Sequence, residues 1–376
     1  MKNAMRRIFG GSFFLGILFS LCACNPSKEA ISLEACPISH ELEFGGVYIA
    51  KTIAEFNGLG FQCGDAVTVS FSNGYKLSEV PYYNGYYTAN GEALLVGYPG
   101  YPYIKAAINN GDDLWNIAGL SENDTASISL AERGKFLDIQ EARDLHYFDE
   151  RSRYPSDAVF ANFRSLSGGN IKANRVFRSA SPCDNQHMRA PYVDLLAEEA
   201  GVEYIVNLAD TEAKIDGYIS EVGFASPHFL SLYRDGKVSL LGLNMNYASE
   251  DFRAKVLDGL RDMINHDGPC LIHCTEGKDR TGFYCALLEA LCGASYEQIR
   301  TDYLITYQNY YFLDPVKDAS KLQVIAESLL DPMMEALGSS AKAKAQAIQN
   351  GAIAYVSSGQ NGLSPSEVSA LQAQLC

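Results

Sequence analysis

Short apolar or alternating runs, separated by turn signals, fill the first third of the chain and predict β-strands. Such runs occupy residues 46–50, 66–70 and 93–96. Between them lie Ser-Asn-Gly, Tyr-Asn-Gly, Pro-Gly and Asn-Gly-Asp sequences, which are typical of tight turns. Regular short strands with such turns predict a small all-β barrel or sandwich over residues 43–150. Tyrosines crowd this region; packing within a small β-domain is the favoured explanation, and a ligand face of stacked rings is the alternative.

In the rest of the chain, the pattern changes to strands that alternate with helices. Residues 202–208 and 269–272 predict buried strands, and residues 281–291 predict a helix. Ser249 is the predicted N-cap of a further helix with an apolar stripe of Phe252, Val256, Leu260 and Met263. This order predicts an α/β domain over residues 151–376, with a central sheet flanked by helices and a helical C-terminal tail.

The first residues have the pattern of a targeting segment. Lys2, Arg6 and Arg7 precede a short apolar run over residues 8–21. This run is too short for a comfortable membrane span and fits a secretory signal. The predicted signal peptide covers residues 1–23.

The end of that segment, Leu-Cys-Ala-Cys at residues 21–24, resembles the bacterial lipobox. The resemblance implies cleavage before Cys24 and attachment of diacylglycerol to its sulfur. We therefore expect an extracytoplasmic protein held at a bacterial membrane by lipids on Cys24, with residues 24–42 as a tether. A plain secretory signal and an uncleaved anchor are the alternatives.

Composition and charge restrict the partners. The 376 residues carry a formal net charge of −15, and without residues 1–23, which hold three cations and no acid, the charge becomes −18. So acidic a chain is not expected to bind nucleic acid generally, because that affinity comes mainly from neutralising phosphates. It also lacks the polybasic composition of a membrane-surface patch. A site for an anionic substrate must therefore be a local positive focus.

The ten cysteines have different expected roles. Cys22 leaves with the signal, and Cys270, Cys285 and Cys292 lie in apolar runs typical of a core. Four others could form disulfides in an exported protein, although the sequence does not show which would pair: Cys36, Cys63, Cys183 and Cys376. The sequence contains no CxxC or Cys/His cluster with metal-ligand spacing, so no metal or organic cofactor is expected.

One motif carries the chemistry, the sequence HCTEGKDRTG at residues 273–282, between the predicted strand and helix. Backbone N–H groups of residues 275–280 can converge on one anion at a helix N-terminus. Gly277 lets the loop curl, and Arg280 offers a planar fork for two phosphate oxygens. Cys274 then faces the bound phosphorus as a nucleophile. Thr281 is expected to hydrogen-bond the sulfur, and His273 to brace the loop.

This string resembles the signature of cysteine-dependent protein tyrosine phosphatases. More narrowly, the Gly-Lys-Asp-Arg-Thr-Gly form is similar to the bacterial family that includes secreted mycobacterial dual-specificity and phosphoinositide-active enzymes. Residues 175–179 match the Phe-Arg-Ser segment of that family, and residues 205–211 fall at its early Asp-Leu-Arg strand end. The resemblance covers residues 155–315 and implies phosphomonoester hydrolysis through a phosphocysteine on Cys274. It implies phosphate binding by these residues: Thr275, Glu276, Gly277, Lys278, Asp279 and Arg280.

A general acid must protonate the leaving oxygen, and the sequence offers three candidates. The family position commonly occupied by Asp is Asn207 here. We rank Asp210, three residues on, first and Asp279, inside the loop, second. Asp235 is third, because its Arg-Asp-Gly context favours a plain turn.

The substrate class depends on the balance of charge in the loop. Lys278 adds a second cation suited to substrates with several phosphates, whereas Glu276 offsets it. Phosphotyrosine in a protein is therefore the expected substrate, and a phosphoinositide or inositol phosphate is the alternative. A second alternative is a lipoprotein that recognises phosphate without turnover, which the intact set of Cys274, Arg280 and Thr281 disfavours.

Overall fold

The computed structural model of the protein describes residues 31–376. The predicted signal peptide, the predicted lipidation site Cys24 and the first part of the predicted tether lie outside the described residues. Within the described range, none of the helices combines the length and apolar character needed to cross a membrane.

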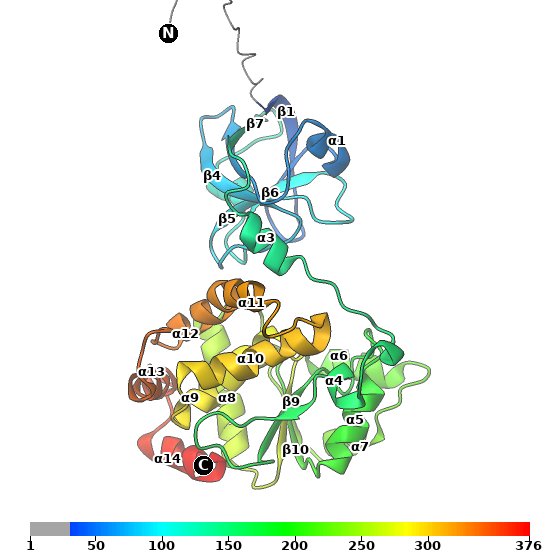
Figure 1. The fold of residues 1–376 in the computed structure, drawn as a ribbon, viewed down its shortest axis with the longest axis vertical. Coiled ribbons are helices and arrows are strands. Elements are labelled where there is room, and N and C mark those ends of the chain that lie inside the picture. Colours follow the sequence, from blue (N-terminus) through cyan, green and yellow to red (C-terminus); the bar gives the residue numbers. More distant parts are fainter. Residues whose placement is uncertain (1–30) are drawn as a thin grey trace, which may run out of the picture. The chain divides into compact units, whose positions relative to one another are not determined.

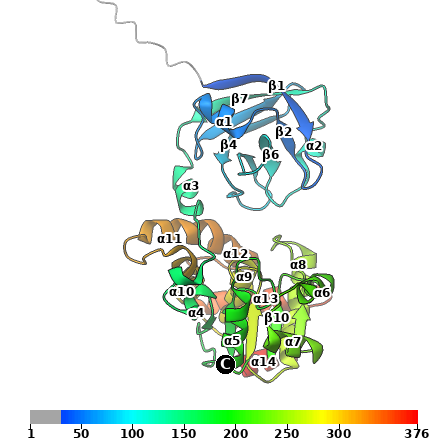
Figure 2. The same cartoon turned by 90° about the vertical axis from the view of Figure 1, so that its right-hand side faces the viewer.

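Seven strands in the N-terminal part form a closed barrel (Figure 1). Around the barrel the strands are β1 (Ser32–His40), β2 (Val47–Ile49), β6 (Ile104–Ile108), β5 (Ala93–Val96), β4 (Lys76–Tyr83), β3 (Ala66–Phe71) and β7 (Thr125–Glu132). β1 pairs antiparallel with β7 and so closes the barrel (Figure 2). The strand at Ser32–His40 lies in the predicted tether, so the β-domain begins earlier than residue 43.

The barrel is filled by alternate strand residues and accompanied by three short helices. These helices are α1 (Ile53–Gly58), α2 (Leu114–Ile117) and α3 (Leu137–Arg143). Val67, Val69 and Phe71 of β3 are buried at alternate positions, as a half-buried strand requires. Tyr82 and Tyr83 are also buried, which fits the packing explanation of the tyrosines.

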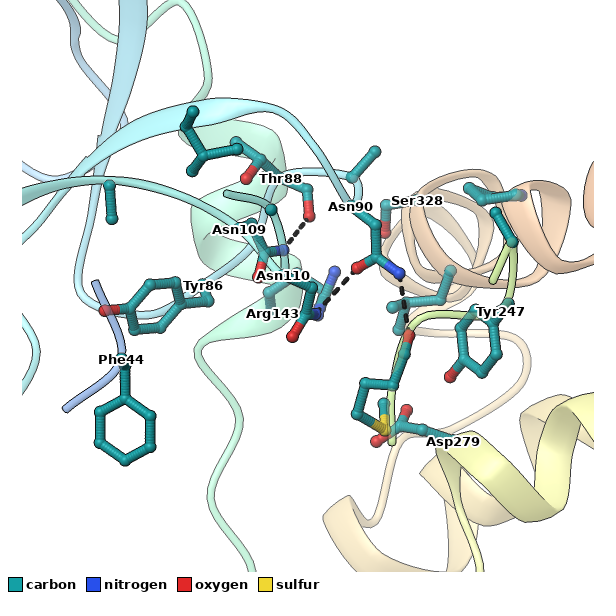
Figure 3. Close-up of a pocket in the computed structure, with 18 of the residues that line it drawn as sticks. Phe44, Tyr86, Thr88, Asn90, Asn109, Asn110, Arg143, Tyr247, Asp279 and Ser328 are labelled. Carbon is teal, nitrogen blue, oxygen red and sulfur yellow. Dashed lines mark hydrogen bonds between the residues drawn. The ribbon is translucent and has the colours of Figure 1, made fainter. Parts of the chain in front are cut away.

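Asparagine side chains tie together the turns at one end of the barrel (Figure 3). Asn109 Nδ2 donates to the Thr88 carbonyl oxygen at 2.6 Å, and Asn110 Nδ2 donates to Asn90 Oδ1 at 2.9 Å. Asn110 has a φ of 45°, a backbone conformation that asparagine tolerates better than most residues. The Asn-Gly-Asp sequence that predicted a turn therefore forms one, and its Asn110 side chain joins it to the turn that contains Asn90.

The C-terminal part contains a five-stranded sheet in the order β11-β10-β12-β9-β8. Its strands are β8 (Arg164–Ser165), β9 (Val176–Ser179), β10 (Tyr204–Asn207), β11 (Val238–Leu240) and β12 (Cys270–His273). All neighbours pair in parallel except β8 and β9. The carboxyl ends of β9, β10, β11 and β12 therefore share one edge, where ligands of open parallel sheets bind.

Helices cover both faces of this sheet (Figure 1). One face packs on α5 (Ala190–Glu199), α6 (Glu212–Ser220) and α7 (Pro227–Arg234), and its core includes Ile205 and Leu271. The other face packs on α8 (Glu250–Ile264) and α9 (Asp279–Leu291), and its core includes Val206 and Ile272. Adjacent strand residues thus enter opposite cores, as the two-residue period of a strand dictates.

Two short helices precede the sheet, and the helices from α10 onward complete the larger core. They are the 3₁₀ turn at Arg151–Arg153, α4 (Asp157–Phe160), α10 (Tyr296–Tyr311), α11 (Ala319–Ile325), a π-helical turn at Ala326–Leu330, α12 (Asp331–Ala336), α13 (Ala345–Ser357) and α14 (Pro365–Leu375). The predicted N-cap Ser249 accepts a hydrogen bond from the Phe252 N–H at 3.1 Å. Ser364 caps α14 in the same way, with Pro365 in its first turn.

The eight cysteines of the described range are free thiols. Cys270, Cys285 and Cys292 are buried in the core, as their apolar surroundings predicted. The four cysteines considered for disulfides are therefore not bridged in this structure.

Candidate active site

The predicted motif forms the connection between β12 and α9 at the carboxyl edge of the sheet. His273 ends the strand, Cys274 follows it, and the helix begins at Asp279. The helix starts two residues before the predicted position, so Asp279 and Arg280 belong to its first turn. Cys274 is only 3% exposed, which protects the thiol from bulk solvent.

The carbonyl groups of the loop are tied to structure outside it. The Ser181 N–H donates to Thr275 O at 3.0 Å, the Tyr310 hydroxyl to Glu276 O at 2.7 Å, and Arg178 Nη2 to Gly277 O at 2.9 Å. In a trans peptide the N–H points opposite to the preceding C=O. The N–H groups of residues 276–278 therefore point away from these partners, and such a set of N–H groups forms an anion-binding nest.

Gly277 is required by both the backbone and the space around it. Its φ is +68°, in the left-handed region where side chains are strained. A Cβ atom there would lie 2.1 Å from the carbonyl oxygen of Ser179 in β9. The loop can therefore lie against β9 only with glycine at this position.

A buried ionic network supports the loop from behind. Arg178, which is 1% exposed, donates to Asp302 Oδ2 as well as to the loop, and Arg164 Nε donates to Asp302 Oδ1 at 2.9 Å. Burial would raise the pKa of Asp302, but the two guanidinium groups outweigh it and lower that pKa. The Asp302 carboxylate therefore stays charged and keeps Arg178 in position to donate to the Gly277 carbonyl oxygen.

Arg280 joins the loop to a neighbouring segment. Its Nη1 donates to Leu243 O at 3.1 Å, and its Nη2 lies 3.5 Å from Thr275 Oγ1. Leu243 follows β11, so the guanidinium connects the carboxyl ends of two strands. This position keeps the planar fork beside the loop that carries Cys274.

Lys278 and Glu276 form an ion pair on the loop. Lys278 Nζ lies 2.8 Å from Glu276 Oε2 and 3.8 Å from Asp279 Oδ2. Burial would lower the pKa of Lys278, but Asp279 and Glu276 outweigh it and raise that pKa well above its ordinary value. The Lys278 ammonium group is therefore charged and already paired with carboxylates.

The three candidate acids differ in position and exposure. Asp210 follows β10 at the edge that carries Cys274, but its side chain is 3% exposed and accepts from Asn207 Nδ2 at 3.0 Å and Tyr218 Oη at 3.3 Å. The Asp279 side chain, in the first turn of α9, is 28% exposed. Asp235 is an exposed residue that precedes β11, so the parallel sheet places it at the opposite edge, and its candidacy was wrong.

His273 and Thr281 are both buried without exposure. His273 Nδ1 lies 3.2 Å from Cys274 O, and burial, reinforced by Arg280 and opposed by Asp210, lowers its pKa to about 4. A neutral buried ring agrees with a bracing role. The Thr281 hydroxyl has no hydrogen-bond partner among residues 31–376, so the predicted bond to the Cys274 sulfur is not formed in this structure.

A comparison with family sequence models shows the family of this chain. The sequence model of a family described as the tyrosine phosphatase family matches residues 158–376. The chain belongs to the tyrosine phosphatase family. The match spans the sheet, the Cys274 loop and the C-terminal helices, and it leaves the barrel outside.

Among solved structures, this phosphatase is similar to the core catalytic domain of the PP-IP phosphatase SIW14 from S. cerevisiae, in complex with citrate. The identity is 18%, the alignment covers 49% of this chain and 93% of that chain, and the TM-score is 0.28. No curated protein matches the chain.

The sequence interpretation missed most residues that hold the loop. Arg178 lay in a segment matched to the family, but nothing indicated its contact with Gly277. Ser181, Tyr310 and Tyr147, whose hydroxyl donates to Glu276 Oε1 at 2.7 Å, carried no signal at all. Their roles depend on contacts between distant parts of the chain, which a local motif does not specify.

Proposed function

We propose that this phosphatase hydrolyses phosphomonoesters, with phosphotyrosine in proteins as its preferred substrate, through a phosphocysteine intermediate on Cys274. The observation that carries the proposal is the loop itself. Three of its carbonyl groups are tied outward, its N–H groups are free to converge on an anion, and Cys274 and Arg280 stand at its two ends.

Two displacements at phosphorus account for the reaction. In the first, the Cys274 thiolate forms an S–P bond, the P–O bond to the leaving group breaks, and a carboxylic acid gives its proton to the leaving oxygen. In the second, water forms a P–O bond, the S–P bond breaks, and the carboxylate takes the proton from water. Inorganic phosphate leaves, and the thiolate is restored.

Exposure favours Asp279 over Asp210 as the acid. A proton donor must come within hydrogen-bond distance of the leaving oxygen. The Asp210 carboxylate is closed in by Asn207 and Tyr218, whereas the Asp279 side chain is partly exposed beside Arg280. Asp210 then serves to order the end of β10 near His273.

The charge balance of the loop supports a substrate with one phosphate. Lys278 is paired with Glu276, so Arg280 and the N–H groups are the positive groups left for the substrate. An inositol phosphate or phosphoinositide with several phosphates is the second candidate, and the presence of Lys278 on the loop is the observation that favours it.

A panel of phosphotyrosine peptides, phosphoserine peptides, phosphoinositides and inositol phosphates, compared by kcat/KM at one ionic strength, tests the substrate class. Fixed salt is needed because screening alters the repulsion between a polyanionic substrate and an acidic protein. A higher kcat/KM for any inositol polyphosphate than for every phosphotyrosine peptide contradicts the proposal.

The nucleophile is tested by Cys274→Ser, which should abolish turnover but retain phosphate or tungstate binding because the loop N–H groups and Arg280 stay in place. Single-turnover trapping of a phosphocysteine in the unmodified protein separates an enzyme from a module that only recognises phosphate. EDTA should not inhibit; inhibition reversed by a divalent cation argues against a thiol mechanism.

We also propose that the protein is a bacterial lipoprotein outside the cytoplasm, anchored through Cys24. The basic residues, the apolar run and the lipobox-like sequence of residues 1–24 support this. Expression of the full chain with a labelled fatty acid should label the membrane-associated protein, and Cys24→Ser should remove the label. Label retained in that variant contradicts the assignment.

A further inference from the structure

Tyr147 reaches the phosphate loop from outside the residues matched by the family. It lies in the segment between α3 and the 3₁₀ turn at Arg151–Arg153, whereas the family match begins at residue 158. Its hydroxyl donates to Glu276 Oε1 at 2.7 Å. A residue that precedes the matched domain therefore touches a side chain of the loop that faces the substrate.

The Tyr147 ring is held on several sides. Its centroid lies 5.3 Å from that of Tyr310 and 5.8 Å from that of Tyr311, both at the end of α10. The His187 ring packs edge-on at 5.3 Å, and the Arg189 guanidinium lies 5.0 Å from the Tyr147 centroid. These contacts fix the direction of the hydroxyl toward Glu276.

The backbone next to Tyr147 is fixed as well. Arg189, which is 2% exposed, donates to Phe148 O and to Asp149 Oδ1, at 2.8 and 2.9 Å. The Tyr154 hydroxyl also donates to Phe148 O at 2.8 Å. A buried guanidinium with this many partners makes the segment part of the active-site domain rather than a loose linker.

Glu276 is consequently held in its charged form against Lys278. Burial would raise the pKa of Glu276, but Lys278 and the Tyr147 hydroxyl outweigh it and lower the pKa to about 2. Lys278 Nζ is 2.8 Å from Glu276 Oε2, 3.8 Å from Asp279 Oδ2 and 3.2 Å from the Tyr311 hydroxyl. Lys278, the second cation of the loop, is thus paired with carboxylates before a substrate binds.

We propose that Tyr147 is a specificity-determining residue, which locks Glu276 onto Lys278 and so denies Lys278 to a second phosphate of the substrate. The inference rests on the proposed function, because it describes which phosphate esters the same loop accepts. Without the hydroxyl of Tyr147, Glu276 loses one of its two side-chain partners and can turn from Lys278. The freed ammonium group then pairs with an additional phosphate.

The test compares kcat/KM for an inositol bisphosphate with kcat/KM for a phosphotyrosine peptide in each variant. Tyr147→Phe keeps the ring and removes the hydroxyl, and the ratio should rise by about tenfold, the size expected of one charge-assisted hydrogen bond. Glu276→Gln should raise the ratio further, because it removes the competing charge. Lys278→Ala added to Tyr147→Phe should cancel the gain, since the lock acts through the lysine.

Tyr296→Phe is the matched control. The Tyr296 hydroxyl also donates to a carboxylate, that of Asp331 at 2.5 Å, but on the other end of α10. Its loss should leave the ratio at the value of the unmodified protein. An unchanged ratio in Tyr147→Phe overturns the proposal, whatever the ratio in Glu276→Gln, and so does an equal rise in the Tyr296 variant.

Binding measurements separate this inference from the proposed function. If the unmodified protein turns over neither substrate, the proposed function fails. In that case pyrophosphate and inorganic phosphate are titrated into the Cys274→Ser protein with and without Tyr147→Phe. If Tyr147→Phe increases the affinity for pyrophosphate more than the affinity for inorganic phosphate, the proposed role of Tyr147 is supported. Equal affinities for pyrophosphate with and without Tyr147→Phe overturn it.

Discussion

Arg178 Nη2 donates to the carbonyl oxygen of Gly277 at 2.9 Å, and the same guanidinium is bonded to Asp302. A buried side chain thereby sets the direction of a peptide group in the phosphate loop. Because the N–H that follows this carbonyl points the opposite way, the contact orients a donor toward the bound anion. The loop geometry is therefore maintained by buried charged side chains.

Arg178→Lys should keep a positive charge but lose the fork that joins Asp302 to Gly277. We expect kcat/KM to fall by about tenfold to a hundredfold, the cost of losing one charge-assisted hydrogen bond that positions the anion site. Tungstate affinity, measured by calorimetry, should weaken in parallel.

Arg164→Lys is the control for that variant, because Arg164 bonds Asp302 but makes no hydrogen bond to residues 274–280. Both substitutions should lower the free energy of unfolding in urea, since each disturbs a buried ion pair. Only Arg178→Lys should weaken tungstate binding. Equal loss of binding in the two variants means that the direct contact of Arg178 with Gly277 has no special role in orienting the loop.

Gly277→Ala tests the close approach of the loop to β9. The added Cβ would lie 2.1 Å from Ser179 O, and the φ of Gly277 is +68°. We therefore expect loss of measurable turnover. The backbone strain alone should lower the free energy of unfolding by about 1–3 kcal/mol. Gly201→Ala is the matched control, because Gly201 has the same φ of +68° but no atom within 4 Å of an added Cβ. It should show the backbone strain without the loss of turnover.

Stability should depend on pH through His273. Burial lowers its pKa to about 4, against about 6.5 in an unfolded chain. Between these values the unfolded state binds a proton that the native state does not, so the free energy of unfolding decreases as pH falls from 6.5 to 4. The slope from one group is at most about 1.4 kcal/mol per pH unit.

Urea unfolding of the unmodified protein and of His273→Gln between pH 4 and pH 8 measures this contribution. The difference between their free energies of unfolding should change with pH only below about 6.5 and level off near 4. A difference that is flat across the range shows that His273 does not titrate on unfolding.

The chemistry of the site could be predicted from the sequence because it is contiguous. Cys274 and Arg280 are six residues apart, and the strand and helix on either side have strong apolar patterns. The contacts that hold the loop could not be predicted. Gly277 bonds Arg178, which is 99 residues away in the sequence, and Glu276 bonds Tyr147, which is 129 residues away. Such pairs become neighbours only through the topology of the sheet.

The boundary of the barrel was missed for a different reason. The sequence SLEACPISH of β1 contains a proline and charged or polar residues, and only Cys36 and Ile38 of it are buried. A strand with so weak an alternation is indistinguishable from a tether when read alone. Its pairing with the nearby β2 and with β7, which lies far along the chain, makes it a strand.

The general acid is decided by comparing Asp279→Asn with Asp210→Asn. If Asp279 protonates the leaving oxygen, its variant should lose about 10²–10⁴-fold in kcat for aryl phosphates with poor leaving groups, and much less for p-nitrophenyl phosphate. Asp210→Asn should affect all leaving groups equally, because its carboxylate orders Asn207 and Tyr218 instead of reaching the substrate. A steeper dependence on the leaving group in Asp210→Asn than in Asp279→Asn returns the role to Asp210.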